Sequence, residues 1–163
     1  MKAVVLKKFG GTENFEVEEI PIPSIKPGCV LIKVHASSVN PVDFKIRQGL
    51  LPIGPCLPAV LHGDLSGEIV EVGQGVTDFR KGDPVYGCVG GFSELPGVLT
   101  EFALADARLL AHKPRNLSFE EAAALPLVAI TSWNALVDRA KVKKGQRILV
   151  HAGMGGGGHI AFQ

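Results

Sequence analysis

Glycine and proline recur along this chain at intervals too short for long helices, and this constrains the fold more than any other feature. The 163 residues include 20 glycines and 11 prolines, about 19% where roughly 12% is usual. Between these breaks, short runs rich in β-branched residues predict strands at residues 2–8, 15–19, 30–36, 65–72, 84–89 and 99–105. Many short strands at regular spacing indicate a small barrel or sandwich.

Two helical segments interrupt this pattern. Asn40 is a good N-cap, a proline follows at the first helical position, and a glycine can close the helix, so we predict a helix over residues 41–48. A capping box opens at Ser118 and begins an Ala-rich helical stretch to about Asp138. Pro126 should break that stretch, because proline removes a helix hydrogen bond.

A glycine-rich loop follows a short apolar run at residues 147–151, which we predict to be a strand. Its spacing satisfies Gly-x-Gly-x-x-Gly, where glycines permit a tight turn and let the backbone approach a pyrophosphate. We therefore predict a dinucleotide-binding turn in which Gly153, Gly155, Gly156 and Gly158 contact the cofactor. A flexible glycine tail is the alternative.

The predicted dinucleotide-binding unit is short. A complete βαβ unit takes roughly 30 residues or more, whereas only 18 run from Gln146 to Gln163. The residue that separates NAD from NADP lies about 20 positions beyond the glycines. We expect the chain to stop inside its own cofactor domain, and hence to bind a nicotinamide cofactor weakly.

Charge and cysteine content exclude several classes of function. Lys and Arg number 17 against 16 Asp and Glu, so no basic excess favours nucleic acid. The three cysteines, Cys29, Cys56 and Cys88, form no Cys-x-x-Cys pair, which argues against a disulfide framework or a structural zinc site. The sequence shows neither a signal peptide nor an apolar run of about 20 residues. We expect a cytoplasmic protein with no membrane contact.

Four further segments carry a family pattern in a fixed order: SVNPVDFKIRQG at 38–49, GDLSGEIVEVG at 63–73, FRKGDPVYG at 79–87 and LSFEEAAALPLVAITSW at 117–133. With the glycine loop, they resemble the medium-chain dehydrogenase/reductase superfamily in its zinc-independent quinone oxidoreductase branch. The resemblance implies a mainly β (α+β) chain. A GroES-like β-barrel catalytic domain would occupy residues 1–113. Connecting helices and the start of a Rossmann domain would follow at 114–163.

The same resemblance implies an activity and its residues. In this family a nicotinamide cofactor, usually NADPH, passes hydride to quinones or to α,β-unsaturated carbonyls. Asn40 and Lys45 would lie near the nicotinamide as catalytic residues, and Thr131 would help seat the cofactor. Asn40 can also be a helix N-cap, and the two roles are compatible. Asp43 is expected to be its capping partner rather than a general acid.

Zinc-dependent alcohol dehydrogenases of the same superfamily are the rival interpretation. They place a zinc-binding Cys where this chain has Asn40 and a zinc-binding His where it has Gly63. His62 is one residue away, and in an extended segment it would point to the opposite side. A catalytic zinc needs about three protein ligands, so we expect no metal.

Other expectations concern the chain as a whole. The family loop usually has Val where this chain has Gly157, and a mid-helix glycine costs roughly 0.8–1.0 kcal/mol relative to alanine. The unpaired strand at 147–151 should drive formation of a homo-oligomer. A non-catalytic binding or assembly module, and a fragment without a role of its own, remain open alternatives.

Overall fold

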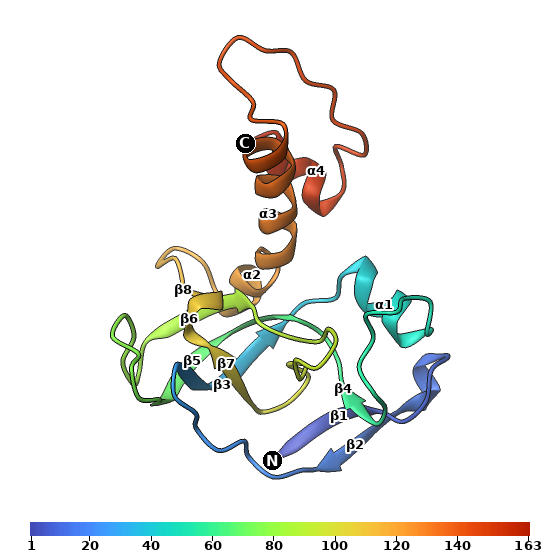
Figure 1. The fold of residues 1–163 in the computed structure, drawn as a ribbon, viewed down its shortest axis with the longest axis vertical. Coiled ribbons are helices and arrows are strands. Elements are labelled where there is room, and N and C mark those ends of the chain that lie inside the picture. Colours follow the sequence, from blue (N-terminus) through green and yellow to red (C-terminus); the bar gives the residue numbers. More distant parts are fainter.

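Eight strands form two antiparallel sheets in the computed structural model, which describes residues 1–163 (Figure 1). The smaller sheet has the order β2 (Phe15–Glu19), β1 (Lys2–Leu6), β4 (Ala59–Val60). The larger sheet has the order β7 (Phe102–Asp106), β3 (Cys29–Ser37), β5 (Asp64–Val72), β6 (Pro84–Cys88), β8 (Leu110–His112). The predicted mainly β architecture is confirmed, and each of the first six predicted strands overlaps an observed one.

Two of the observed strands were not predicted from the sequence. β4 has two residues and β8 has three, so neither is long enough to show an alternating pattern. Both are defined by their partners instead, since β4 pairs with β1 and β8 pairs with β6.

The core lies on the inner face of the larger sheet. Alternate residues of each strand point inward, and nine buried apolar side chains meet there: Val30, Ile32, Leu65, Ile69, Val85, Val89, Val98, Ala103 and Ala105. A smaller cluster of Leu6, Ile46 and Leu61 joins the second sheet to helix α1 (Pro41–Arg47).

Residues 98–101 connect the two sheets. Val4 donates its backbone N–H to the Leu99 carbonyl at 2.8 Å, and Thr100 forms an isolated antiparallel bridge with Ala3. On the other side, the N–H of Val34 in β3 donates to the Glu101 carbonyl at 2.9 Å. This short segment therefore holds β1 and β3 close together without belonging to either sheet.

The helices follow the predicted boundaries closely. α1 is one residue shorter than the predicted 41–48 segment. The Ala-rich stretch divides at Pro126 into α2 (Phe119–Ala123) and α3 (Pro126–Trp133), and a π-helical turn, η3 (Asn134–Arg139), extends it. Two 3₁₀ turns, η1 (Thr12–Asn14) and η2 (Ala107–Leu109), complete the barrel.

A helical lobe stands on the barrel. In Figure 1, α3 rises away from the sheets and α4 (Gly156–Ala161) packs beside it. The Ser132 hydroxyl donates to the carbonyls of Val128, at 2.9 Å, and Gly157, at 2.7 Å, so it ties the two helices together. No helix of the chain combines the length and apolar character that a membrane span requires.

The prediction of a strand at residues 147–151 is wrong, because the structure has no strand there. The segment belongs to no sheet, and its backbone makes no backbone–backbone hydrogen bond. The physical reason is that a strand needs a neighbour, and no strand of this chain lies beside it.

Candidate active site

Asn40 lies in the link between β3 and α1, and it is 7% exposed. Its side-chain Nδ2 donates to the Oδ2 of Asp64 at 2.9 Å and to the Ser38 hydroxyl at 3.3 Å. Its backbone N–H donates to Oδ2 of Asp43 at 2.6 Å, so Asp43 is the capping partner that the sequence predicts. These contacts fix the side chain of Asn40 at the start of the helix.

Asp64 is the centre of this arrangement, and the sequence analysis did not identify it. It is the first residue of β5 and is fully buried. Besides Asn40, its carboxylate accepts from the Ser38 hydroxyl at 3.0 Å and from the backbone N–H of Leu127, in the first turn of α3, at 3.1 Å. One carboxylate therefore joins the β3–α1 link to the base of the helical lobe. Its only sequence signal was an acidic residue at the start of a buried apolar strand.

Three more ionisable side chains surround Asp64. Burial raises the pKa of Asp43 above its usual value, and the hydrogen bond from the Asn40 backbone N–H, followed by the charge interaction with His62, opposes that rise. Burial lowers the pKa of His62, against the pull of the Asp43 carboxylate. Burial first, and then the charge of Asp64, raises the pKa of the Cys88 thiol to about 12, so this thiol is not a nucleophile at neutral pH.

His62 is strained and incompletely paired. Its backbone φ is +69°, in the left-handed region that non-glycine residues seldom adopt. Its Nδ1 is buried and has no hydrogen-bond partner. Strain of this kind tends to collect near functional sites, and this residue lies beside the Asn40–Asp64 pair.

The structure leaves no room for a side chain at Gly63. A Cβ there would lie 2.5 Å from the Gly90 carbonyl oxygen and 3.2 Å from Sγ of Cys88. A zinc-binding histidine at this position would require the Gly90 backbone to move. No group of three or more His, Cys, Asp or Glu side chains is arranged to hold a metal ion.

Lys45 and Thr131 lie outside the Asn40–Asp64 cluster. Lys45 is on the exposed face of α1. Thr131 is exposed on α3, and its hydroxyl donates back to the Leu127 carbonyl at 2.8 Å. Because Leu127 also donates to Asp64, α3 connects the position of Thr131 to the buried cluster.

The glycine loop lies beside α3 along the segment from Val128 to Ser132. Gly155 is the N-cap of α4, and a Cβ on Gly156 would lie 2.9 Å from a methyl group of Val128. A Cβ on Gly158 would lie 2.2 Å from the Ala152 carbonyl oxygen, so the helix can approach the loop only because this residue is glycine. Gly153 is restricted similarly by the ring of Phe162, at 2.5 Å. The four predicted cofactor glycines therefore lie with Thr131 in the lobe, apart from Asn40.

Comparison with known proteins agrees with this architecture. The alcohol dehydrogenase GroES-like domain family matches residues 26–115. The NADPH-dependent alkenal/one oxidoreductase of Arabidopsis thaliana, a chloroplastic protein, is 41% identical over 169 residues, which cover all of this chain and 44% of the relative. The quinone oxidoreductase of Homo sapiens is 38% identical over 164 residues, which cover all of this chain and 49% of the relative.

Among solved structures, an alcohol dehydrogenase superfamily protein from Novosphingobium aromaticivorans is 46% identical, with a TM-score of 0.95. The match covers 99% of this chain and 48% of that one. This chain thus spans about half the length of the relatives that it matches. It belongs to the alcohol dehydrogenase GroES-like domain family, within the medium-chain dehydrogenase/reductase superfamily and beside its quinone oxidoreductases.

Proposed function

We propose that this chain supplies the barrel and the first cofactor contacts of an NADPH-dependent reductase of quinones and α,β-unsaturated carbonyls. The proposal rests on the buried network that holds Asn40 against Asp64 and α3. It is supported by relatives named as a quinone oxidoreductase and an NADPH-dependent alkenal/one oxidoreductase. The division into a barrel domain at 1–113 and the lobe at 114–163 belongs to the same proposal.

The proposed mechanism assigns each side chain a separate task. Bound NADPH would supply the hydride. Asn40, held by Asp64, would give the nicotinamide a fixed polar neighbour, because a side chain that is already ordered loses little entropy when ligand binds. Lys45, exposed on α1, would place a positive charge where negative charge develops on the substrate oxygen.

The proposed cofactor contacts lie in the lobe. Gly153, Gly155, Gly156 and Gly158 bring the loop backbone close to the start of α4, where N–H groups can face a pyrophosphate. Thr131 is exposed on the adjacent helix α3. NADPH is preferred as the cofactor because of the relative that is named as NADPH-dependent.

The test is a chimera of this chain with the half of human quinone oxidoreductase that it does not match. NADPH oxidation should depend on an added quinone or enone. Asn40→Ala should lower kcat at least tenfold, whereas Lys33→Met, at an exposed position of β3, should not. A folded chimera without activity would refute the function, and an unaffected Asn40→Ala variant would refute the role of Asn40.

A zinc-type alcohol dehydrogenase is the alternative within the superfamily. We infer that the chain holds no zinc, because Asn40 replaces one ligand and Gly63 has no space for another. Elemental analysis of purified protein tests this directly. About one zinc per chain would overturn the assignment to the metal-independent branch.

An assembly role also has an observation in its favour. The lobe exposes large apolar side chains, among them Trp133, Leu149 and Phe162, which are 63%, 79% and 70% exposed. We infer that the chain forms a homo-oligomer through residues 147–151.

A cytoplasmic location remains a prediction, since one relative is named as chloroplastic.

A further inference from the structure

Asn40, Ser38 and Asp64 form a closed ring of hydrogen bonds that uses both N–H groups of the Asn40 amide. Nδ2 of Asn40 donates to Oδ2 of Asp64 at 2.9 Å and to the Ser38 hydroxyl oxygen at 3.3 Å. The Ser38 hydroxyl in turn donates to the same Oδ2 at 3.0 Å. A side-chain amide nitrogen carries only two protons, so Asn40 has no donor left for a ligand.

The carboxylate of Asp64 determines which way round the Asn40 amide lies. Its contact with α3 is also with a donor, since the N–H of Leu127 lies 3.1 Å from Oδ1 of Asp64. Turning the Asn40 amide over would place its carbonyl oxygen against Oδ2 of Asp64, and two acceptors cannot bond to each other. Asp64 is fully buried, so solvent would not replace the lost hydrogen bond.

The side-chain carbonyl oxygen of Asn40, Oδ1, is the polar atom that remains for a ligand. Asn40 makes no side-chain cap hydrogen bond, because the N–H of Asp43 donates to the Asn40 backbone carbonyl at 2.9 Å. Among the fully buried side-chain nitrogen and oxygen atoms, Nδ1 of His62 is the one without a partner. Oδ1 of Asn40 is therefore accessible at the surface, and it can only accept a hydrogen bond.

Two buried carboxyl groups decide what kind of donor suits this oxygen. Asp64 bonds to the side chain of Asn40 and Asp43 bonds to its backbone N–H, and Asp43 is only 3% exposed. A carboxylate with so little solvent around it repels another anion. A phosphate or a developing oxyanion is therefore disfavoured beside Asn40, and a neutral hydroxyl or amide N–H is favoured.

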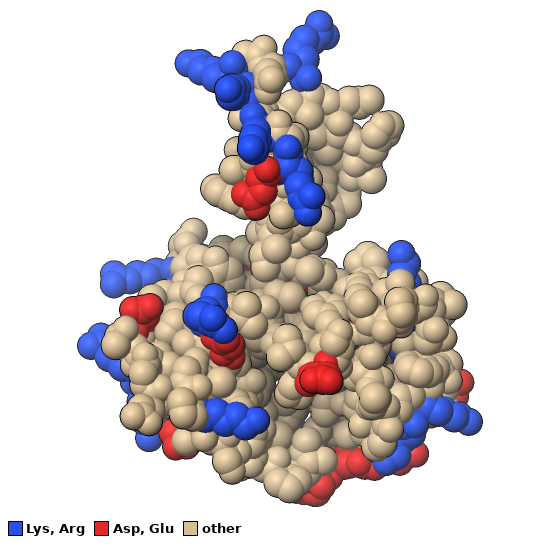
Figure 2. Space-filling model, in the orientation of Figure 1, with Lys and Arg blue, Asp and Glu red and all other residues tan.

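The part of the chain that would attract phosphates lies elsewhere. Residues 139–163 contain five Lys and Arg and no Asp or Glu, and Figure 2 shows basic side chains gathered on the upper lobe. The phosphates of a dinucleotide would be drawn toward that positive charge. The reduced nicotinamide and its ribose, which carry no charge, are then the part of the cofactor that suits Asn40.

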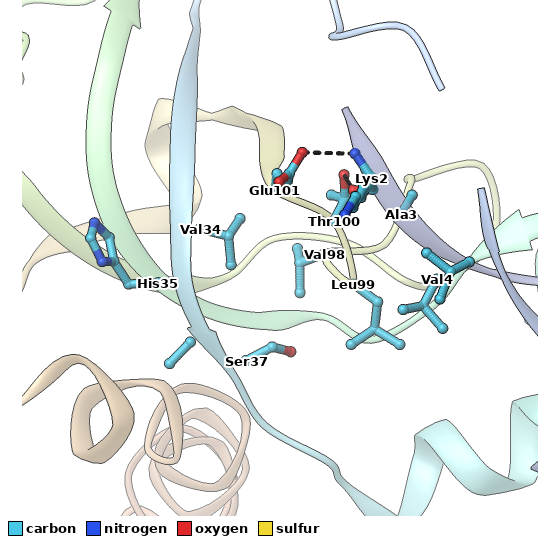
Figure 3. Close-up of a pocket in the computed structure, with 12 residues that line it drawn as sticks. Lys2, Ala3, Val4, Val34, His35, Ser37, Val98, Leu99, Thr100 and Glu101 are labelled. Carbon is cyan, nitrogen blue, oxygen red and sulfur yellow. Dashed lines mark hydrogen bonds between the residues drawn. The ribbon is translucent and has the colours of Figure 1, made fainter. Parts of the chain in front are cut away.

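The segment that carries this ring of hydrogen bonds is held in place on two sides. Strand β3 ends immediately before Ser38. In Figure 3, His35 points to the opposite side of β3 from Val34, and its ring stacks on Phe119 of α2 with centroids 4.3 Å apart. With the bond from Leu127 of α3 to the carboxylate, these contacts fix the orientation of the amide before any ligand binds.

We propose that Asp64 is a positioning residue that turns the N–H groups of Asn40 inward, so that Oδ1 of Asn40 accepts a hydrogen bond from a neutral donor of the nicotinamide riboside. That donor is the carboxamide N–H or a ribose hydroxyl. The inference rests on the proposed function and deepens it. Asn40 holds the cofactor, and another group must stabilise the negative charge that develops on the substrate oxygen.

NMR of the 163-residue chain without cofactor tests the orientation. The two Nδ2 protons of Asn40 should exchange with water at least tenfold more slowly than those of the exposed Asn116. Ser38→Ala removes one acceptor and should speed the exchange of one proton, whereas Ser38→Thr keeps the hydroxyl and should restore the protection. Asp78→Asn, at an exposed position, is the control and should change neither. Exchange at Asn40 as fast as at Asn116 overturns the orientation.

Calorimetry of the chimera described above tests the acceptor role. Asn40→Ala should weaken NADPH binding at least tenfold, and Asp78→Asn should not weaken it. The reduced acetylpyridine analogue of NADPH has a methyl group in place of the carboxamide NH₂. If the carboxamide is the donor, binding of this analogue should be insensitive to Asn40→Ala. If a ribose hydroxyl is the donor, Asn40→Ala should weaken the binding of both cofactors alike.

Failure of this inference can be told apart from failure of the proposed function. A chimera that reduces quinone, but whose Asn40→Ala variant binds NADPH as tightly as the unmodified protein, overturns this inference alone. Loss of the protection of the Asn40 Nδ2 protons when NADPH binds would show that the amide turns over, and it would have the same consequence. A folded chimera that binds no NADPH overturns both.

Discussion

Asp64 joins three parts of the chain through one buried carboxylate. Asp64→Ala would leave donors of Asn40, Ser38 and Leu127 without an acceptor. Each unpaired buried donor costs about 1–3 kcal/mol, so we expect the free energy of unfolding to fall by at least about 3 kcal/mol. Urea denaturation measures this free energy of unfolding. The exposed Asp78→Ala is the control and should change stability by less than about 0.5 kcal/mol. An Asp64→Ala variant as stable as the control would show that the cluster is not structural.

His62 should make stability depend on pH. Its pKa is lowered by burial, so the folded state binds protons less readily than the unfolded state. Its contribution is complete above its usual pKa of 6.5 and is lost as the pH falls below that value. Asp43 acts in the opposite direction, because burial raises its pKa and protonation removes a buried charge.

His62→Asn isolates the histidine contribution. Asn tolerates a φ of +69° better than most residues, so the backbone should be preserved. Between pH 8 and pH 5.5, the variant should lose less stability than the unmodified chain in urea denaturation. His151→Asn, which removes an exposed histidine, should keep the original pH dependence. An unchanged slope in the His62 variant would refute the prediction.

At the scale of single residues, the sequence predicted local roles such as helix capping better than contacts between residues that are far apart in the chain. Asn40 as an N-cap and Asp43 as its capping partner follow from local spacing, and the structure confirms both. Asp64 and His62 gain their importance from chain folded against them, 63 residues away in the contact of Asp64 with Leu127. No local pattern carries that information.

Among the elements, α4 offers a matched test of two adjacent glycines. A Cβ on Gly157 would meet Oγ of Ser132 at 3.6 Å, an ordinary contact, whereas a Cβ on Gly158 would lie 2.2 Å from the Ala152 carbonyl. Gly157→Ala should therefore stabilise α4 by up to about 1 kcal/mol, and Gly158→Ala should displace it. Hydrogen exchange at His159, whose N–H donates to Gly155, reports on both. Equal protection in the two variants would contradict the packing described.

The helices and strands also show where sequence patterns suffice to predict the position of an element. α1 and α2 have caps in their own sequence, and the six longer strands have β-branched runs, so their positions were predicted within a few residues. β4, β8 and the π-helical η3 depend on partners or on packing that no short window contains. The prediction of a strand at residues 147–151 was wrong for the converse reason, since the segment has strand-forming residues but no strand beside it.

On the scale of the whole molecule, α3 connects the two proposed parts of the site. Its first turn is held by Asp64, and its later residues carry Ser132, which bonds to Gly157 of the loop. At about 1.5 Å per residue, the five residues from Leu127, which bonds to Asp64, to Ser132, which bonds to Gly157, correspond to a rise of about 7.5 Å along α3. A nicotinamide dinucleotide is an extended ligand, so contacts near the buried cluster and along the glycine loop are compatible with one bound molecule.

Cofactor affinity is the remaining prediction for the 163-residue chain. The proposed contacts are the loop backbone, Thr131 and Asn40, and both Thr131 and much of the loop are exposed. Binding must also offset the entropy of ordering the ligand and the loop. We therefore expect NADPH to bind this chain no more tightly than about 1 mM, or about −4 kcal/mol.

Isothermal titration calorimetry with NADPH tests that affinity, and an assay of NADPH oxidation with a quinone should give no rate above background. The chimera with the unmatched half of human quinone oxidoreductase should gain both binding and turnover, because additional chain can surround the adenine and ribose. The same titration should be run on the Leu149→Pro variant, which is expected to be monomeric. Micromolar binding by the unmodified chain that Leu149→Pro abolishes would mean that a second copy completes the site. Micromolar binding by both would mean that the barrel and lobe of one molecule already form it, and the weak-binding prediction would then be wrong.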